Sequence, residues 1–273
     1  MLQEKRWIAG YTLASGVARC RALNRHGVRC LINFLGEHCK DVESCDFGVS
    51  EYSRVIRAIK NNKLDAAISF KLSQLGLGFS AGLALRNAER IISLAEKSGV
   101  FCWLDGEKSE LTGREQKVFL KLRAKHANVG IALIAGLRDA PRQLAKLGDT
   151  PVRLVKGAYE EQESVAFTTR REIDAAFGEL MRLLFQRGGR FAVATHDPAF
   201  LKQAFELEKE NKKAKVEYQF LFGVDDARFL KLARSHCIVF YVPYGLEFHH
   251  YVRRRLEEQR RFRQTSKQLV RHL

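Results

Sequence analysis

Short apolar segments alternate along this chain with longer segments in which apolar residues recur every three or four positions. The short segments are rich in β-branched and aromatic residues, as buried strands are, whereas the longer ones have the period of a helix with one apolar side. Eight such pairs follow one another. The predicted strands are residues 30–35, 66–72, 100–105, 129–134, 151–156, 190–195, 215–221 and 237–242.

A helical segment follows each predicted strand, and one further helix, residues 12–26, precedes the first strand. The eight following helices are expected at residues 50–60, 81–98, 114–127, 138–147, 165–186, 198–210, 225–234 and from Leu246 onward. Alternating strands and helices form a parallel sheet, and eight units in a chain of this length favour a closed barrel. We therefore expect an α/β fold, a (β/α)8 TIM-type barrel that forms one domain over residues 1–273. The leading N-terminal helix precedes it, and the C-terminal helix lies over the barrel mouth.

The alternative fold is an open, doubly wound sheet, which also consists of alternating strands and helices. Nucleotide-binding proteins of that class usually carry GxGxxG after the first strand, or the phosphate-binding motif GxxxxGK[ST]. The first motif does not follow the first predicted strand, and the second does not occur in the sequence. The pattern therefore favours the barrel.

In such a barrel, functional residues lie where the strands end and the following loops begin. Charged, polar and aromatic residues are concentrated at these positions, more than a purely structural barrel end requires. They include Lys71, Asp105, Glu107, Gly157, Ala158, Tyr159, Thr195, His196, Glu217, Gln219 and Tyr241. Each alone also fits an ordinary role, such as a rim charge for Lys71, a helix cap for Asp105 and a loop for His196.

The last predicted helix carries a second group of chemically distinctive residues. Tyr251, Arg254, Arg255 and Glu258 are spaced at i, i+3, i+4 and i+7, so they share one helix face. Two neighbouring guanidinium groups can hold a carboxylate in a bidentate geometry that lysines do not offer. An arginine-rich helix is also typical of a solvated surface, and this stretch alone does not exclude that interpretation.

Composition narrows the classes of partner without choosing among them. The chain has 47 Lys and Arg against 31 Asp and Glu, a net charge of +16, which favours anionic partners. The N-terminus lacks the apolar core of a signal peptide, and no segment approaches the length of a membrane span. The six cysteines, at positions 20, 30, 39, 45, 102 and 237, show no metal-binding spacing. We expect them to be reduced thiols in a cytoplasmic protein with no metal site.

Several motifs in order along the chain resemble those of the proline dehydrogenase family, whose members are FAD-dependent (β/α)8 barrel enzymes. These motifs are SFKLSQLGL at 69–77, WLDGE at 103–107, RLVKGAYEE at 153–161, ATHDP at 194–198, EYQFLFGV at 217–224, and YVPYG with YVRRRLEE at 241–258. They cover nearly the whole chain, and RLVKGAY together with YxxRRxxE is highly specific. The resemblance implies oxidation of L-proline to 1-pyrroline-5-carboxylate, the first step of proline catabolism, with FAD as cofactor and a quinone as electron acceptor.

The resemblance also assigns roles to individual residues. The substrate carboxylate is expected to contact Lys71, Arg254 and Arg255, and the proline ring to be enclosed by Tyr159, Tyr241 and Tyr251, with Leu154 beside them and Asp105 next to the lysine. The residues expected to bind FAD are Arg153, Val155, Gly157, Ala158, Thr168, Arg170, Thr195, His196, Glu217 and Gln219. One position departs from the family pattern, because Ile134 stands where a glutamine commonly contacts the flavin.

Two other functions remain open at this point. One is a flavoenzyme for a related cyclic imino acid such as hydroxyproline, although the phenol of Tyr241 leaves little room for an added hydroxyl. The other is a non-catalytic barrel whose basic surface binds nucleic acid or membrane. The proline dehydrogenase interpretation predicts no nucleic-acid partner. It allows peripheral contact with the inner face of a membrane through the basic C-terminal residues, including Arg260, Arg261 and Arg263.

Overall fold

The computed structural model describes residues 4–36 and 39–257, and Glu258 and the basic residues after it lie outside these ranges. Eight parallel strands form a closed barrel in the order β1 to β8, with β8 pairing back to β1. The strands are β1 (Arg29–Phe34), β2 (Ala66–Phe70), β3 (Cys102–Leu104), β4 (Val129–Ile134), β5 (Val152–Val155), β6 (Gly189–Ala194), β7 (Ala214–Leu221) and β8 (Ile238–Tyr244). The predicted fold class is confirmed.

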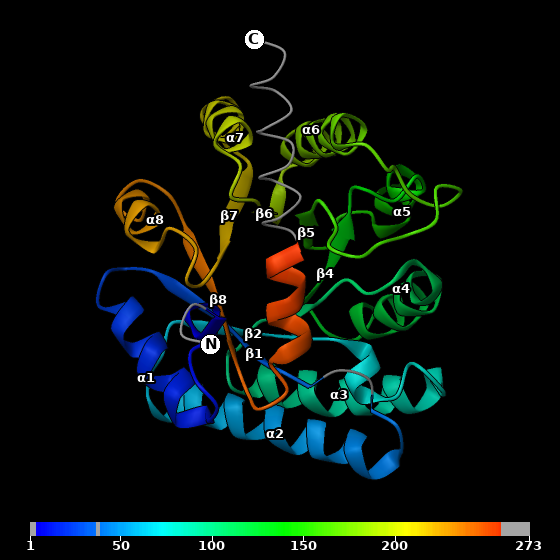
Figure 1. Cartoon of the computed structure of the whole chain (residues 1–273), viewed down its shortest axis with the longest axis vertical. Coiled ribbons are helices and arrows are strands. Elements are labelled where there is room, and N and C mark those ends of the chain that lie inside the picture. The colour runs from blue at the N-terminus through cyan, green and yellow to red at the C-terminus, as the bar shows by residue number, and fades with distance from the viewer. Residues whose placement is uncertain (1–3, 37–38, 258–273) are drawn as a thin grey trace.

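Helices surround the barrel, as Figure 1 shows. They are α1 (Leu13–Asn24), α2 (Val42–Asn61), α3 (Ala81–Lys97), α4 (Ser109–Arg123), α5 (Ala140–Leu147), α6 (Arg170–Arg187), α7 (Pro198–Glu210) and α8 (Asp226–Leu232), with 3-10 turns η1 (Glu4–Trp7) and η2 (Leu72–Leu75). Residues 249–257 form a further helix, drawn in orange-red, which crosses the barrel mouth beside the dark blue N-terminal segment. Among the described residues, no helix has the length and apolar character to cross a membrane.

The two faces of each strand have different surroundings because successive side chains point to opposite sides. On β5, Leu154 belongs to the large apolar core between the barrel and its helices, whereas Arg153 and Val155 line a cavity at the barrel end. Within the barrel, Trp103 and Val239 belong to a smaller apolar cluster. Apolar side chains therefore fill the middle of the barrel, below the cavity at the carboxyl ends of the strands.

Two elements differ from their predicted bounds for local chemical reasons. Helix α2 begins at Val42 rather than near residue 50, because the Asp41 side chain accepts from Ser44 N at 2.8 Å and completes a capping box. Strand β8 continues through Pro243 to Tyr244, beyond its predicted end at residue 242. Pro243 lies in register with Asn33 of β1, and the chain turns instead at Gly245, whose φ is +135°.

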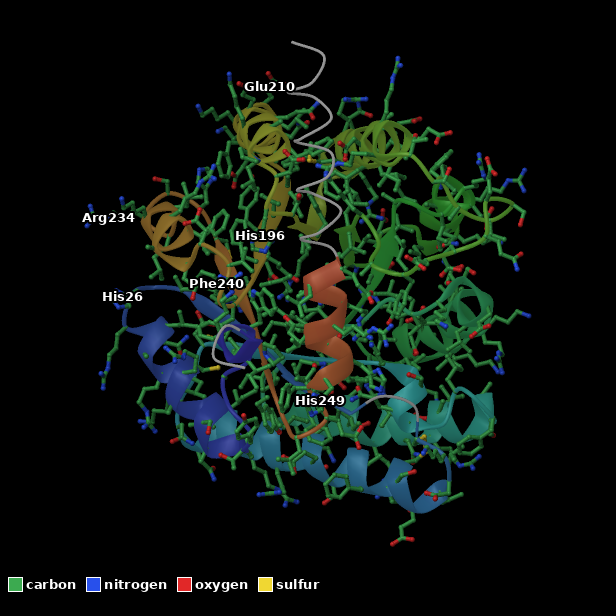
Figure 2. The ribbon with its side chains drawn as sticks, in the orientation of Figure 1. His26, His196, Glu210, Arg234, Phe240 and His249 are labelled. Atoms are coloured by element: carbon green, nitrogen blue, oxygen red, sulfur yellow. A yellow bond between two sulfur atoms is a disulfide. The ribbon has the colours of Figure 1, made fainter. Side chains whose placement is uncertain are left out.

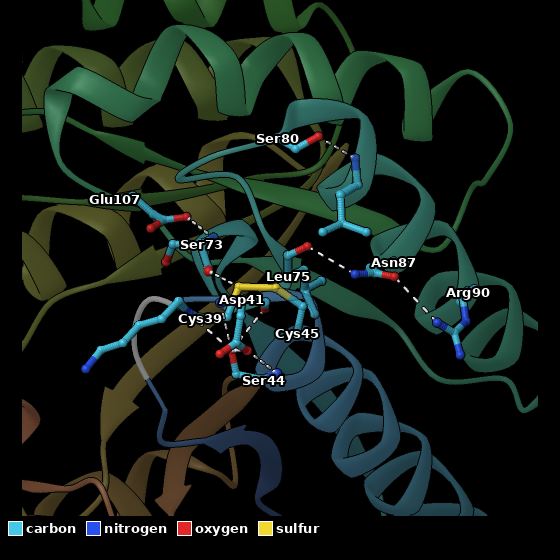
Figure 3. Close-up of a disulfide and its surroundings, with 12 residues drawn as sticks. Cys39, Asp41, Ser44, Cys45, Ser73, Leu75, Ser80, Asn87, Arg90 and Glu107 are labelled. Carbon is cyan, nitrogen blue, oxygen red and sulfur yellow. Dashed lines mark hydrogen bonds between the residues drawn. A yellow bond between two sulfur atoms is a disulfide. The ribbon is translucent and has the colours of Figure 1, made fainter.

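A disulfide joins Cys39 and Cys45, so the expectation that all six cysteines are reduced thiols is wrong for this pair. The bond connects the loop after β1 to the first turns of α2, as Figure 3 shows. Two cysteines only six positions apart can meet here because a capped helix start folds the chain back on itself. The other four cysteines are free thiols, three of them buried.

Candidate active site

A cavity of about 670 Å³ opens at the carboxyl ends of the barrel strands. Most of the side chains that the sequence predicts for the site line this cavity. They are Lys71, Asp105, Arg153, Val155, Gly157, Ala158, Tyr159, Arg170, Thr195, His196, Gln219, Tyr241, Tyr251, Arg254 and Arg255. The barrel brings them together because the ends of all eight parallel strands meet at one rim.

Cations and aromatic rings from separate elements lie close together in this cavity. Lys71, directly after β2, has its ammonium nitrogen 5.8 Å from the centre of the Tyr159 ring. The guanidinium carbon of Arg254, on the C-terminal helix, lies 5.7 Å from the same ring. Arg255 lies 5.6 Å from the Tyr251 ring. Cations gathered around aromatic faces suit a small molecule that has both a carboxylate and an apolar ring.

Asp105 is fixed by a hydrogen-bonded network at the floor of the cavity. The buried carboxylate accepts from Arg153, from Ser69 Oγ at 2.5 Å and from the Tyr241 hydroxyl at 2.8 Å. Burial and the neighbouring Asp105 charge raise the pKa of Tyr241 well above its ordinary value. Tyr241 therefore stays protonated, and its ring, stacked 6.5 Å from that of Tyr251, is held in one orientation.

His196 contributes a neutral imidazole to the opposite side of the cavity. Its Nε2 accepts a hydrogen bond from the backbone N–H of Leu221 at 2.9 Å, so the ring proton resides on Nδ1. Burial, together with the smaller effect of the Arg255 charge, lowers the pKa of His196 to about 4. Within the described part of the chain, the buried Nδ1 has no hydrogen-bond partner, and Figure 2 shows the residue near the centre of the barrel end. Its N–H could donate to a molecule bound in the cavity.

An ion-pair network borders this side of the cavity. Lys156 contacts Asp174 at 2.6 Å and Asp197 at 3.0 Å, and Arg170 contacts the same two carboxylates, each at 2.7 Å. Burial alone would raise the pKa of Asp197, but the two cations hold it below its ordinary value. The network fixes the start of α6 against the start of α7 and places Arg170 at the cavity wall.

The structure does not bring three of the expected residues to the cavity. Leu154 points the other way on β5, between the two strand residues that do line it. Thr168 is exposed in the loop before α6, whose cap is Thr169. Glu217 is buried lower on β7, where it pairs with Arg190 at 2.6 Å and Arg29 at 3.3 Å, both near the amino ends of their strands.

Two further cavity residues, Trp7 and Ile134, were assigned no binding role from the sequence. Trp7 reaches the cavity from η1, ahead of the first predicted helix, where no periodic pattern marks it. Ile134 lines the cavity between two glycines, and a Cβ atom added at Gly106 or Gly157 would lie 3.0 or 2.9 Å from its side chain. The absence of the family glutamine at this position was the only sequence signal for Ile134.

A flavin nucleotide fits the chemistry of the residues present. Cationic side chains match its phosphates, and the buried His196 Nδ1 provides a donor without a protein partner. At Gly157, φ is +113°, so the backbone passes close to Ile134 where a side chain would collide. Within residues 4–36 and 39–257, no cluster of His, Cys, Asp and Glu could hold a metal ion.

Comparison with known proteins shows the family of this chain. The sequence profile of the family described as proline dehydrogenase matches residues 17–268. Proline dehydrogenase 1 of Bacillus subtilis is 32% identical over 263 residues, which cover 94% of this chain and 87% of that protein. Proline dehydrogenase of Deinococcus radiodurans is 29% identical, with 93% and 85% covered. The chain belongs to the proline dehydrogenase family.

Solved structures show the same fold in larger proteins. Proline utilization A from Bdellovibrio bacteriovorus, solved after inactivation by N-propargylglycine, superimposes with a TM-score of 0.86 at 20% identity over 94% of this chain. Its counterpart from Bradyrhizobium japonicum, a D779Y mutant, gives a TM-score of 0.74 at 19% identity over 87%. This chain spans about a third of the length of either protein, 32% and 29% respectively.

Proposed function

We propose that this protein is a flavin-dependent oxidoreductase that converts L-proline to 1-pyrroline-5-carboxylate as the first step of proline catabolism. Membership of the proline dehydrogenase family supports the reaction. The observation that carries the assignment is the placement of Lys71 and Arg254 at 5.8 and 5.7 Å from the centre of one ring, that of Tyr159, in a cavity that Arg255 also lines. We further propose that the barrel acts as a single domain.

The cations bind and orient the substrate. Lys71, Arg254 and Arg255 hold the carboxylate, while Tyr159, Tyr241 and Tyr251 enclose the ring. A carboxylate fixed at several points leaves the ring little freedom to rotate, which presents the carbon next to the nitrogen in one direction. The same positive charges disfavour the ammonium form of the ring nitrogen, so they promote loss of the proton that must leave when the imine forms.

FAD is the proposed cofactor. When bound, it supplies the acceptor for the hydride that leaves the proline ring carbon. We assign Val155, Gly157 and Ala158 to its ring edge, and Thr195 and His196 to its nucleotide part. Arg153, which forms an ion pair with Asp105 on the cavity floor, adds a fixed positive charge that favours negative charge on a reduced ring. Because the Ile134 side chain has no hydrogen-bonding group, it would contribute only packing against that ring.

We also propose that the electrons pass to a quinone and that the protein makes peripheral contact with a membrane. The support for membrane contact is the net charge of +16 and the basic residues after Glu258, which lie outside the described ranges. Sedimentation with anionic and neutral vesicles, for the full chain and for a chain ending at Gln259, tests this contact. Equal binding to both kinds of vesicle would contradict it.

The experiment that tests the reaction is product analysis. The purified protein is incubated with L-proline and a soluble quinone, and the product is identified by mass spectrometry. We expect a product that has lost one hydride and one proton relative to proline. Hydroxyproline, run in parallel, tests the alternative substrate. We expect a much lower kcat/KM for it, because the Tyr241 hydroxyl, fixed on Asp105, leaves no room for another hydroxyl on the ring.

A further inference from the structure

The helix that carries the two arginines packs on an apolar cluster separate from the main core. The buried members of this cluster are Trp7, Ile8, Leu35, Tyr251 and Val252, and Val224, Tyr241, Phe248 and Leu256 flank them. Among the described residues, the main core between barrel and helices includes none from 249–257. The apolar support of this helix therefore comes from the N-terminal segment, the end of β1 and the loops around them.

The N-terminal segment is itself tied to the barrel rim. Ala9 N donates to the carbonyl of Pro243 at 2.8 Å, and Gly245 N donates to the carbonyl of Gly10 at 3.1 Å. A Cβ atom at Gly223 would lie 2.0 Å from the Arg6 carbonyl oxygen, so only glycine allows this close approach of the two backbones. The segment is thus held between the ends of β7 and β8.

Trp7 is the large side chain at the centre of this arrangement. It is 1% exposed, it lines the cavity, and it shares the cluster with Tyr251 and Val252 from the first turn of the helix. The Arg6 guanidinium covers its ring at 4.7 Å. A helix as short as residues 249–257 is only marginally stable by itself, so its orientation depends on the surface against which it packs.

We propose that Trp7 is a positioning residue for substrate binding: it supports Tyr251 and Val252 and thereby holds Arg254 and Arg255 at the cavity. The proposal rests on the proposed function, because it assigns the substrate carboxylate to those arginines. On a helix, Arg254 and Arg255 lie three and four positions after Tyr251, so a shift of the Tyr251 side chain moves both guanidinium groups. A small displacement of binding groups is enough to weaken a fixed contact geometry.

Kinetics of Trp7→Ala and Trp7→Phe in the full chain test the proposal. We expect Trp7→Ala to raise the KM for proline about tenfold while kcat and flavin content change little. Displacement of Arg254 and Arg255 weakens substrate binding more than it slows the chemical step. Trp7→Phe fills most of the space and is expected to restore a KM near that of the wild type. Trp7→Leu provides a milder variant, with an intermediate KM, should Trp7→Ala fail to fold.

Hydrogen exchange provides a second measurement, which reports on the helix itself rather than on the stability of the whole protein. Peptides covering residues 246–257 are expected to exchange faster in Trp7→Ala than in the wild type. The matched control is Val28→Ala, which removes a side chain of 1% exposure from the main core, away from this helix. Unchanged KM and exchange in Trp7→Ala, or an equal rise of KM in Val28→Ala, would overturn the proposal. If the wild type does not oxidise proline, the proposed function is refuted. The exchange comparison would still show whether Trp7 stabilises the helix.

Discussion

At the scale of single residues, Tyr159 is the point around which the charges of the cavity gather. Lys71 and Arg254 are far apart in the sequence, yet both lie within 6 Å of its ring centre, at 5.8 and 5.7 Å. Two like charges held this close favour binding of an anion between them. Such charge placement suits the proposed reaction, which requires an oriented substrate.

Replacement of the arginines tests this placement. Arg254→Met and Arg255→Met are each expected to raise the KM for proline more than tenfold, because loss of a charge-assisted contact costs about 1.5–3 kcal/mol. Flavin content should stay close to that of the wild type. Arg253→Met is the matched control, because Arg253 is exposed on the same helix and forms an ion pair with Glu257 at 2.9 Å. Wild-type KM in both cavity variants would show that the helix is an ordinary solvated surface.

His196 makes a prediction about pH. Its pKa is lowered from 6.5 to about 4, so the folded protein prefers the neutral ring while the unfolded chain takes up a proton below pH 6.5. The stabilising contribution is therefore complete above pH 6.5 and is lost as the pH falls towards 4, by on the order of 1 kcal/mol between pH 7 and 5. Urea unfolding at the two pH values measures it. His196→Asn should show a smaller loss between them, and an identical loss in both proteins would contradict the assignment.

At the scale of elements, periodicity predicted the strands and most helices to within a few residues because each pattern is local. Strand β4 and helix α7 have the predicted bounds, 129–134 and 198–210. The start of α2 was missed because the polar residues around Asp41 resemble a loop, although Cys45, Val49 and Tyr52 continue the buried face of the helix at i, i+4 and i+7. Only the capping box reveals that the helix begins there.

The site likewise contains residues that a local pattern predicts and residues whose position depends on the folded structure. Residues at strand ends, such as Lys71 and Tyr241, could be predicted because a barrel brings every strand end to one rim. Leu154 and Glu217 could not be placed from motif position alone. Whether a strand residue points inward, and how far below the rim it lies, depends on the register of the closed sheet. Trp7 was missed because its position depends on packing against residues more than two hundred positions away.

The disulfide gives a prediction at this scale. The Cys39–Cys45 bond restricts the loop between β1 and α2 next to Ser73, whose backbone N–H donates to Glu107 at 2.8 Å (Figure 3). Loss of so short a cross-linked loop is expected to lower the free energy of unfolding by about 2 kcal/mol. Denaturant unfolding of Cys39→Ser/Cys45→Ser, compared with the wild type, measures this change. A reductant should destabilise the wild type and leave the double variant unaffected, and equal stability throughout would contradict a formed disulfide.

At the scale of the whole molecule, the barrel is a rigid frame, and the two ends of the described chain cover part of its mouth. The N-terminal segment and the C-terminal helix meet over the mouth (Figure 1), where they share one apolar cluster. The cavity cations lie on this face, where they can bind a carboxylate. Fold and family membership therefore agree on a barrel oxidoreductase that acts on proline.

Anaerobic titration of the purified protein with L-proline tests the central claim most directly. The wild type is expected to carry a flavin spectrum that bleaches as proline is added, because the substrate carboxylate held by Lys71, Arg254 and Arg255 orients the ring for hydride loss. Arg254→Met should keep the same initial spectrum and require a much higher proline concentration for bleaching. A protein that binds no flavin, or a bound flavin that proline does not bleach at any concentration, would contradict the account.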